Sequence, residues 1–346
     1  MRILVVGDSY VPVEVFRRGL QTLADRHELD FVQLDESRTL EATSDSERRI
    51  REYAGTPDQL VGRLDGHEVL VVHGAPVTDE VLSVGSLRLV CCARGGPVNV
   101  DVEAASQRGL PVVTTPGKNA DAVADQTLAF MVMLARGFPK AQRYLAEGHT
   151  AGETAFEGAE FFGHDLGGMT LGLVGFGNVG QRVAQRASAF GMHVSVYDPY
   201  RDSNGDGTVD QVNDLDDLLH TADVVSLHAR ATPENENLFD ARRFAAMKDG
   251  SYFVNTARES LVDESALDDA LATGKLAGAA LDVLRPHQGS GPHPLLRHEN
   301  VVLTPHIGGA THETLLRGAM MVAAEIERFA AGQPVVNVIN REAVGT

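Results

Sequence analysis

Short apolar runs alternate along most of the chain with segments whose apolar residues recur at helical spacing. The strand-like runs of the first third are MRILVVGD, ELDFVQL, EVLVVHG, RLVCCAR and PVVTTPG. A second series consists of LGLVGFG, HVSVYD, DVVSLH, SYFVNTA, AGAALDV and VVLTPH. This alternation is typical of parallel sheets covered by helices on both faces. We therefore expect an α/β protein with two doubly wound parallel-sheet domains.

A long helical pattern, NADAVADQTLAFMVMLAR, begins at Asn119. We expect this helix to end near Gly137 and Pro139, because both residue types terminate helices. Residues 35–51 are highly charged and predict a solvated loop leading into a helix. The motif SNGDG at 203–207 predicts a turn, since it has too few spaced acids for a calcium loop.

Length and charge narrow the class of protein. With 346 residues and 43% hydrophobic content, the chain can form two globular domains. Its 30 basic and 48 acidic residues give a net charge of −18, which repels nucleic acids and anionic membranes. The N-terminus lacks the features of a signal peptide, and no run reaches the roughly 18 apolar residues that span a bilayer. We expect a cytoplasmic protein without nucleic-acid or membrane partners.

Cys91 and Cys92 are the only cysteines, and they are adjacent within an apolar run. This arrangement offers no disulfide framework. We interpret both as packing residues, with a reactive thiol as the alternative.

A glycine signature follows the first strand-like run of the second series. Gly175, Gly177 and Gly180 form GFGNVG between a strand and a helix, and Asp198 follows the next strand, 21 residues after Gly177. Glycines allow the chain to turn tightly and approach a pyrophosphate, the helix N-terminus supplies free amides, and the acid accepts hydrogen bonds from ribose hydroxyls. The pattern predicts a dinucleotide site, and a tight turn without a ligand is the alternative.

Asp198 also bears on the choice of cofactor. Its charge would repel the 2′-phosphate of NADP, so NAD is the predicted cofactor. Arg201 lies three residues further on and would weaken this preference.

Several spaced motifs resemble those of one family. The segments SYFVNTARESLVDESAL, GAALDV and NVVLTPHIGGAT, with RGGPVNVDVEAASQRGLPVVTTPGKNADAVADQTLA earlier, are similar to the D-isomer-specific 2-hydroxyacid dehydrogenases, a family that includes phosphoglycerate dehydrogenase. The resemblance extends from about Val90 to the C-terminus. It implies a split flavodoxin-like substrate domain and a Rossmann NAD-binding domain, with the active site in the cleft.

The resemblance also suggests boundaries and assembly. The substrate domain would comprise residues 1–118 completed by 317–346, and the NAD-binding domain residues 119–316. The family pattern implies a homodimer formed through the nucleotide domain. We expect no C-terminal regulatory module, because the sequence ends soon after PVVNVIN.

Two residues would carry the chemistry. Arg258 matches the family's arginine that grips the substrate's carboxylate and keto oxygen, and Glu259 stands where the family has glycine. His306 matches the acid/base histidine. A guanidinium suits a bidentate carboxylate, and an imidazole suits proton transfer near neutral pH.

The remaining site residues follow by the same resemblance. Cofactor contacts are expected from Gly175, Gly177, Asn178, Val179, Gly180, Asp198, Thr256, Ala257, Asp282, His306 and Gly308. Contacts to the substrate's carboxylate are expected from Arg94, Gly95, Gly96 and Arg258.

One family residue is replaced in this chain. The family has a glutamate five residues after the aspartate of its LDV motif, and here that position is His287. A carboxylate beside an imidazole favours its charged form, whereas a second imidazole does not. We hypothesise that His306 still acts as acid/base, oriented by a neutral His287. Alternatively, His287 contacts the substrate together with Arg94.

A metal site at His287, His293 and His298 is a weaker hypothesis. Their spacing lies in a loop, no cysteine contributes, and hydride transfer in the family needs no metal. We expect no metal and interpret His293 and His298 as surface residues.

These motifs together predict a function. We expect an NAD-dependent oxidoreductase that interconverts a D-2-hydroxy acid and its 2-oxo acid, a small molecule that could be phosphorylated or sugar-derived. The alternative is an NAD(H)-sensing regulatory protein on a dehydrogenase-like scaffold, with little or no turnover.

Overall fold

The structure is a computed structural model that describes residues 1–36, 45–149, 161–201, 209–287 and 291–344. It divides the chain into two compact units. The first comprises Met1–Lys118 with Thr311–Thr346, and the second comprises Asn119–Ala310. The turn expected at 203–207 lies outside the described residues.

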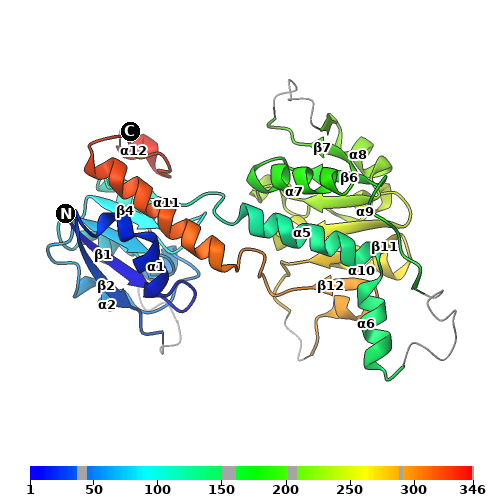
Figure 1. Ribbon diagram of the computed structural model, residues 1–346, viewed down its shortest axis with the longest axis horizontal. Helices are drawn as coiled ribbons and strands as arrows, with labels where there is room; N and C mark the ends of the chain where they lie inside the picture. Colours follow the sequence, from blue (N-terminus) through cyan, green and yellow to red (C-terminus); the bar gives the residue numbers. More distant parts are fainter. Residues whose placement is uncertain (37–44, 150–160, 202–208, 288–290, 345–346) are drawn as a thin grey trace. The chain divides into compact units, whose positions relative to one another are not determined.

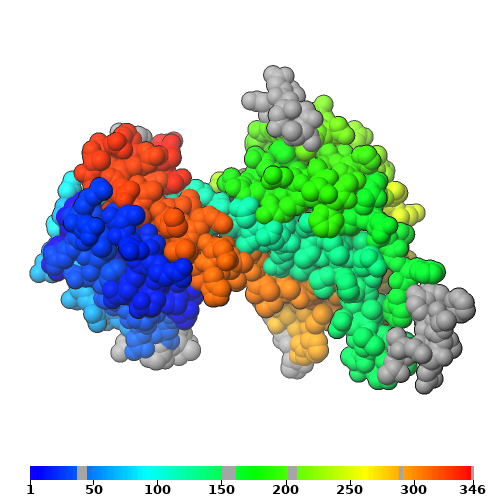
Figure 2. Space-filling model, in the orientation of Figure 1, coloured from blue at the N-terminus to red at the C-terminus, as the bar shows by residue number. Residues whose placement is uncertain are grey.

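The second boundary differs from the one suggested by the sequence, because residues 311–316 belong to the first unit. The Oγ1 atom of Thr311 accepts the backbone N–H of Thr314 at 3.1 Å and caps helix α11 (His312–Ala330). That helix packs against α1 (Val13–Gly19) of the same unit. In Figure 2 its side chains lie directly on the blue N-terminal segment.

The first unit contains a parallel sheet of order β2-β1-β3-β4-β5. Its strands are β1 (Arg2–Gly7), β2 (Glu28–Gln33), β3 (Val69–Val72), β4 (Leu89–Cys92) and β5 (Val112–Val113). β3 and β4 are buried throughout, as expected of strands covered on both faces. This strand order is that of flavodoxin-like folds.

Helices cover both faces of this sheet (Figure 1). One face packs on α1 and α11, and the other packs on α2 (Asp58–Val61), α3 (Asp79–Ser83) and α4 (Val102–Gln107). Shorter elements are η1 (Gln21–Leu23), η2 (Glu47–Arg49) and α12 (Arg341–Val344). Cys91 faces one core and Cys92 the other, both fully buried, which confirms that they are packing residues.

The second unit contains a parallel sheet of order β12-β11-β10-β9-β6-β7-β8. Its strands are β6 (Thr170–Val174), β7 (His193–Tyr197), β8 (Asp210–Gln211), β9 (Val224–Leu227), β10 (Ser251–Asn255), β11 (Leu276–Leu281) and β12 (Val301–Leu303). The two-residue strand β8 was not expected, because it carries no apolar run.

Two layers of helices enclose this sheet as well. One face packs on α5 (Ala120–Ala135) and α7 (Asn178–Ala189), and the other on α8 (Leu215–Thr221), α9 (Ala241–Ala246) and α10 (Glu264–Ala272). The remaining elements are α6 (Phe138–Ala146), η4 (Pro233–Asn235), η5 (Glu259–Leu261) and η6 (Pro294–Arg297). α5 ends before Gly137 as predicted, and Pro139 then lies in the first turn of α6, where its missing N–H costs nothing.

The strand order reverses once in each sheet, between β1 and β3 in the first unit and between β6 and β9 in the second. Ligands of open α/β sheets bind beyond the carboxyl ends of the strands at such switch points. None of the helices formed by the described residues is long and apolar enough to cross a membrane.

Candidate active site

The glycine turn of the second unit joins β6 to α7 at the switch point. Gly175 has a φ of +97°, and a Cβ there would lie 2.6 Å from the backbone nitrogen of Ala229. A Cβ on Gly180 would lie 2.4 Å from the carbonyl oxygen of Gly175. Both positions therefore require glycine for the turn itself.

Gly177 differs from the other two glycines. It is the N-cap of α7, and a Cβ built there would meet nothing within 4 Å among the described atoms. Asn178 and Val179 form the first turn of the helix, whose amides no side chain of the described residues caps. An open cradle in front of free helix amides is the arrangement that a pyrophosphate needs.

Asp198 lies at the end of β7, beside the glycine turn. Its carboxylate accepts the backbone N–H groups of Phe176 at 2.8 Å and Tyr200 at 2.9 Å. The Arg201 guanidinium lies over the Phe176 ring, 4.3 Å from its centroid. Asp198 and Arg201 both line a cavity of about 460 Å³. Asp198, the predicted ribose-binding residue, and Arg201, which is expected to weaken the preference for NAD, therefore border the same cavity.

His228 was not singled out from the sequence, although it follows β9 on the other side of the switch point. Its backbone carbon would lie 2.8 Å from a Cβ at Gly175, so it backs the glycine turn. Burial lowers the pKa of His228 to about 3, and Ser226 Oγ lies 2.9 Å from its Nε2 atom. The ring is therefore neutral at physiological pH and adds no charge behind the turn.

Arg258 follows β10 and is exposed. Asn255 fixes its backbone, because the Asn255 side chain donates to the Arg258 carbonyl at 2.9 Å and accepts the Ala257 N–H at 2.9 Å. Arg258 Nη1 donates to the Ala257 carbonyl at 2.7 Å. Thr256 is buried, with its hydroxyl 3.0 Å from that of Thr127.

Glu259 follows Arg258 and stands where the family has glycine. It opens the regular 3₁₀ turn η5 and has no positive φ. The backbone here does not require the glycine that the family has, so glutamate is accommodated without strain.

Asp282, at the end of β11, is the anchor for the loop that follows β12. Its buried carboxylate accepts hydrogen bonds from Gln126 Nε2 at 2.9 Å and Thr304 Oγ1 at 2.5 Å. It also accepts the backbone N–H groups of Ile307 at 2.9 Å and Gly308 at 2.8 Å. A Cβ on Gly308 would lie 2.8 Å from this carboxylate, so the loop can approach the carboxylate only with glycine at position 308.

His306 is held within this loop. Its backbone N–H donates to the Asp282 carbonyl at 2.8 Å, and its side chain is exposed. Its φ is +56°, a conformation that non-glycine residues adopt rarely and that recurs at functional sites. β10 and β12 flank β11, so Arg258 and His306 lie at the same edge of the second unit's sheet.

His287 is exposed, and its ring lies 5.8 Å from that of His293. Among the described contacts, none joins His287 to His306.

The interpretation of His293 and His298 as surface residues is wrong. Their side chains are only 13% and 12% exposed, because His293 pairs with Glu264 at 3.4 Å and His298 with Asp268 at 2.7 Å. These acids come from α10, which the sequence did not indicate as their neighbour. Within the described ranges, no group of three or more potential ligands could hold a metal ion.

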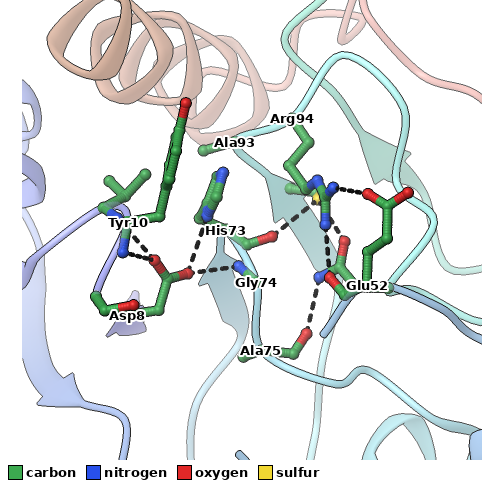
Figure 3. A network of polar contacts seen from close by, with 12 residues as sticks. Asp8, Tyr10, Glu52, His73, Gly74, Ala75, Ala93 and Arg94 are labelled. Atoms are coloured by element: carbon green, nitrogen blue, oxygen red, sulfur yellow. Dashed lines mark hydrogen bonds and ion pairs between the residues drawn. The ribbon is translucent and has the colours of Figure 1, made fainter. Parts of the chain in front are cut away.

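Arg94, Gly95 and Gly96 follow β4 in the first unit. The guanidinium of Arg94 forms an ion pair with the Glu52 carboxylate and donates to the Glu52 carbonyl at 2.8 Å (Figure 3). Gly95 and Gly96 are exposed, and no atom within 4 Å would obstruct a Cβ at Gly96. The loop therefore presents open backbone beside a paired arginine.

Lys118 was also missed. It is only 8% exposed in the first unit, and its Nζ donates to the Ala93 carbonyl at 2.6 Å. Burial lowers the pKa of Lys118 to about 8.

The fold and the glycine turn define a dinucleotide-binding α/β protein. Residues 128–308 match the family model described as "D-isomer specific 2-hydroxyacid dehydrogenase, NAD binding domain". The chain belongs to this family. The predicted family, fold class and cofactor NAD are confirmed.

Named relatives agree with this assignment. A glyoxylate reductase from Korarchaeum cryptofilum is 36% identical over 97% of this chain and 96% of its own length. A D-3-phosphoglycerate dehydrogenase from Archaeoglobus fulgidus is 38% identical over 82% of this chain. The match covers only 53% of that relative, so the chain spans about half its length. The solved TT0316 protein from Thermus thermophilus is 33% identical with a TM-score of 0.75, covering 98% of this chain and all of its own.

Proposed function

We propose that the protein is an NAD-dependent oxidoreductase that interconverts a D-2-hydroxy acid and its 2-oxo acid. One observation carries the proposal: Arg258 and His306 are exposed at the sheet edge where the glycine turn lies, and the His306 loop is anchored by three hydrogen bonds to the Asp282 carboxylate. NAD, when bound, would supply the hydride-transfer chemistry at the carbon that bears the hydroxyl.

The chain's own residues would supply the other parts of the reaction. Arg258 would bind the substrate's carboxylate and its C2 oxygen, since a planar guanidinium donates two parallel hydrogen bonds. His306 would take the hydroxyl proton as hydride leaves the same carbon, and return a proton to the keto oxygen in the reverse reaction. The exposure of both side chains supports these roles.

Other residues of the site would contact the cofactor. Gly177, Asn178 and Val179 would meet the pyrophosphate, and Asp198 the ribose. Thr256, Ala257 and Asp282 would lie along the nicotinamide, with Gly308 and His306.

Arg94, Gly95 and Gly96 would bind the carboxylate of the same substrate. Their support is the open backbone at the end of β4. Substrate would compete with Glu52 for the Arg94 guanidinium, and Glu52→Gln is expected to lower KM.

His287 would orient His306 in place of the family's glutamate. The pH dependence of kcat/KM for the His287→Glu variant, measured in both the oxidative and the reductive direction of the reaction, tests this role. A profile identical to that of the parent would remove His287 from the mechanism.

We further propose that the protein works in the cytoplasm as a homodimer. Its net charge of −18 and the family resemblance support these two statements. Light scattering of the purified chain measures the mass directly, and a monomer would refute the dimer.

A substrate panel tests the activity itself. The purified protein is expected to oxidise NADH in the presence of at least one 2-oxo acid, among glyoxylate, pyruvate, hydroxypyruvate and 3-phosphohydroxypyruvate. Binding of NADH without turnover of any of them would favour an NAD(H)-sensing protein.

A further inference from the structure

Asp8 and His73 meet at the switch point of the first unit's sheet. Asp8 follows β1 and His73 follows β3, and these two strands pair directly. The Nδ1 atom of His73 lies 2.9 Å from Asp8 Oδ2. The place where open α/β sheets bind ligands is therefore occupied by a carboxylate–imidazole pair.

The Asp8 carboxylate is buried and fully used. Its Oδ1 accepts the backbone N–H groups of Tyr10 at 2.9 Å and Val11 at 2.7 Å, and its Oδ2 accepts that of Gly74 at 2.7 Å besides His73. Burial acts to raise the pKa of Asp8, but the hydrogen bonds and the charge of His73 outweigh it and hold the pKa below its ordinary value. Asp8 is therefore ionised at neutral pH.

An ionised carboxylate only accepts, so Nδ1 of His73 carries the proton that is shared with Asp8. Nε2 lies on the opposite side of the ring (Figure 3), and among the described residues none hydrogen-bonds to it. Tyr10 stacks on the ring with centroids 5.1 Å apart and 9° between planes. A histidine that only linked the two loops would need Nδ1 alone. In His73 the Nε2 atom is also held in a fixed direction.

The charges around the His73 ring determine which kind of group Nε2 would bind. The Arg94 guanidinium is paired with the Glu52 carboxylate, and the ionised Asp8 carboxylate lies directly behind the His73 ring. This negative charge opposes a second anion such as a phosphate beside Nε2, whereas a neutral hydroxyl can donate to that atom.

We propose that His73 Nε2 binds a hydroxyl group on the third carbon of the substrate, with Asp8 and Tyr10 as positioning residues. The inference rests on the proposed function, in which Arg94, Gly95 and Gly96 take the carboxylate. β3 and β4 pair directly, and paired strands lie about 4.8 Å apart. Their two ends can therefore hold neighbouring groups of one small acid.

Side-chain geometry provides a discriminating variant. His73→Asn places an amide nitrogen where Nδ1 lies, so it keeps the bond to Asp8 and removes Nε2. The ratio of kcat/KM for hydroxypyruvate to that for pyruvate is expected to fall about 10- to 100-fold. His193→Asn, at an exposed histidine of the second unit, should leave the ratio unchanged.

Asp8→Asn tests the positioning role. It should raise KM for hydroxypyruvate relative to KM for pyruvate. Equal effects on both substrates would show that Asp8 only stabilises the loop.

Binding gives a second readout that does not need turnover. With NADH bound, D-glycerate should raise the Tm of the parent more than D-lactate does, and His73→Asn should abolish this difference. An unchanged ratio or Tm difference in His73→Asn would overturn the inference, as would a His73-dependent preference for 3-phosphohydroxypyruvate over hydroxypyruvate. Absence of turnover with every 2-oxo acid would instead refute the proposed function, and the Tm comparison would still decide the role of His73.

Discussion

The carboxylate of Asp282 accepts the backbone N–H of Gly308 at 2.8 Å, and this bond ties the end of β11 to the loop that presents His306. The contact is possible because Gly308 has no Cβ, which would lie 2.8 Å from the same oxygen. The exposed histidine is therefore placed by a buried acid rather than by contacts of its own ring.

Asp282→Asn should misplace this loop. The variant turns one of the accepting oxygens into an N–H donor, which would oppose the donors that surround it. We expect the free energy of unfolding to fall by about 2 kcal/mol or more, as measured by urea denaturation, and kcat to fall with it. Asp269→Asn, at an exposed residue of α10, should change neither. Unchanged stability in Asp282→Asn would contradict the anchoring role.

Substitutions at two glycines of the nucleotide turn should separate effects on folding from effects on cofactor binding. Gly175→Ala strains a φ of +97° and pushes a Cβ to 2.6 Å from Ala229, so we expect it to lower the free energy of unfolding by about 2 kcal/mol or more. Gly177→Ala should cost less than about 1 kcal/mol as an N-cap change. It should nevertheless raise the Kd for NADH at least about tenfold, because its Cβ occupies the space of the pyrophosphate. Normal NADH affinity in a folded Gly177→Ala variant would place the cofactor elsewhere.

Asp198 and Arg201 should set the preference for NAD over NADP. Asp198→Ser removes the charge that repels a 2′-phosphate and leaves the Arg201 guanidinium nearby. The ratio of kcat/KM with NADPH to that with NADH is expected to rise at least about tenfold. Adding Arg201→Ala should reverse part of this gain. Steady-state kinetics with both cofactors measure the ratio, and no change would exclude Asp198 from cofactor selection.

Lys118 should make the free energy of unfolding depend on pH in the alkaline range. Its pKa of about 8 in the folded protein lies below the 10.5 of an unperturbed lysine, so the unfolded state binds more protons between these values. The free energy of unfolding of the parent should therefore rise between pH 8 and 10.5 relative to that of Lys118→Met, by up to about 3 kcal/mol. Lys140→Met, at an exposed lysine, should follow the parent throughout. Parallel curves for parent and Lys118→Met would show that Lys118 keeps an ordinary pKa.

Local pattern in the sequence was sufficient to predict the two parallel sheets and the glycine turn. Buried parallel strands are continuous apolar runs, and the turn, helix and acid of the nucleotide site lie within 24 consecutive residues from Gly175 to Asp198. By contrast, β8 has two polar residues and no apolar run, so its pairing depends on tertiary structure alone.

The residues that sequence reasoning missed depend on distant partners. Asp8 and His73 are 65 positions apart, and Gln126 and Asp282 are 156 positions apart. Their proximity follows only from the order of the strands, which alternation along the chain does not specify. His293 and His298 were misjudged for the same reason, because their acidic partners come from α10.

Single-turnover rates of NADH oxidation by His306→Asn and Arg258→Lys, each measured with the Kd for NADH, test the central claim most directly. We expect His306→Asn to lower the rate about 100- to 10,000-fold, and Arg258→Lys to lose much of the 2-oxo acid's affinity, while both bind NADH as the parent does. Parent-like rates in His306→Asn, with NADH bound normally, would contradict the account.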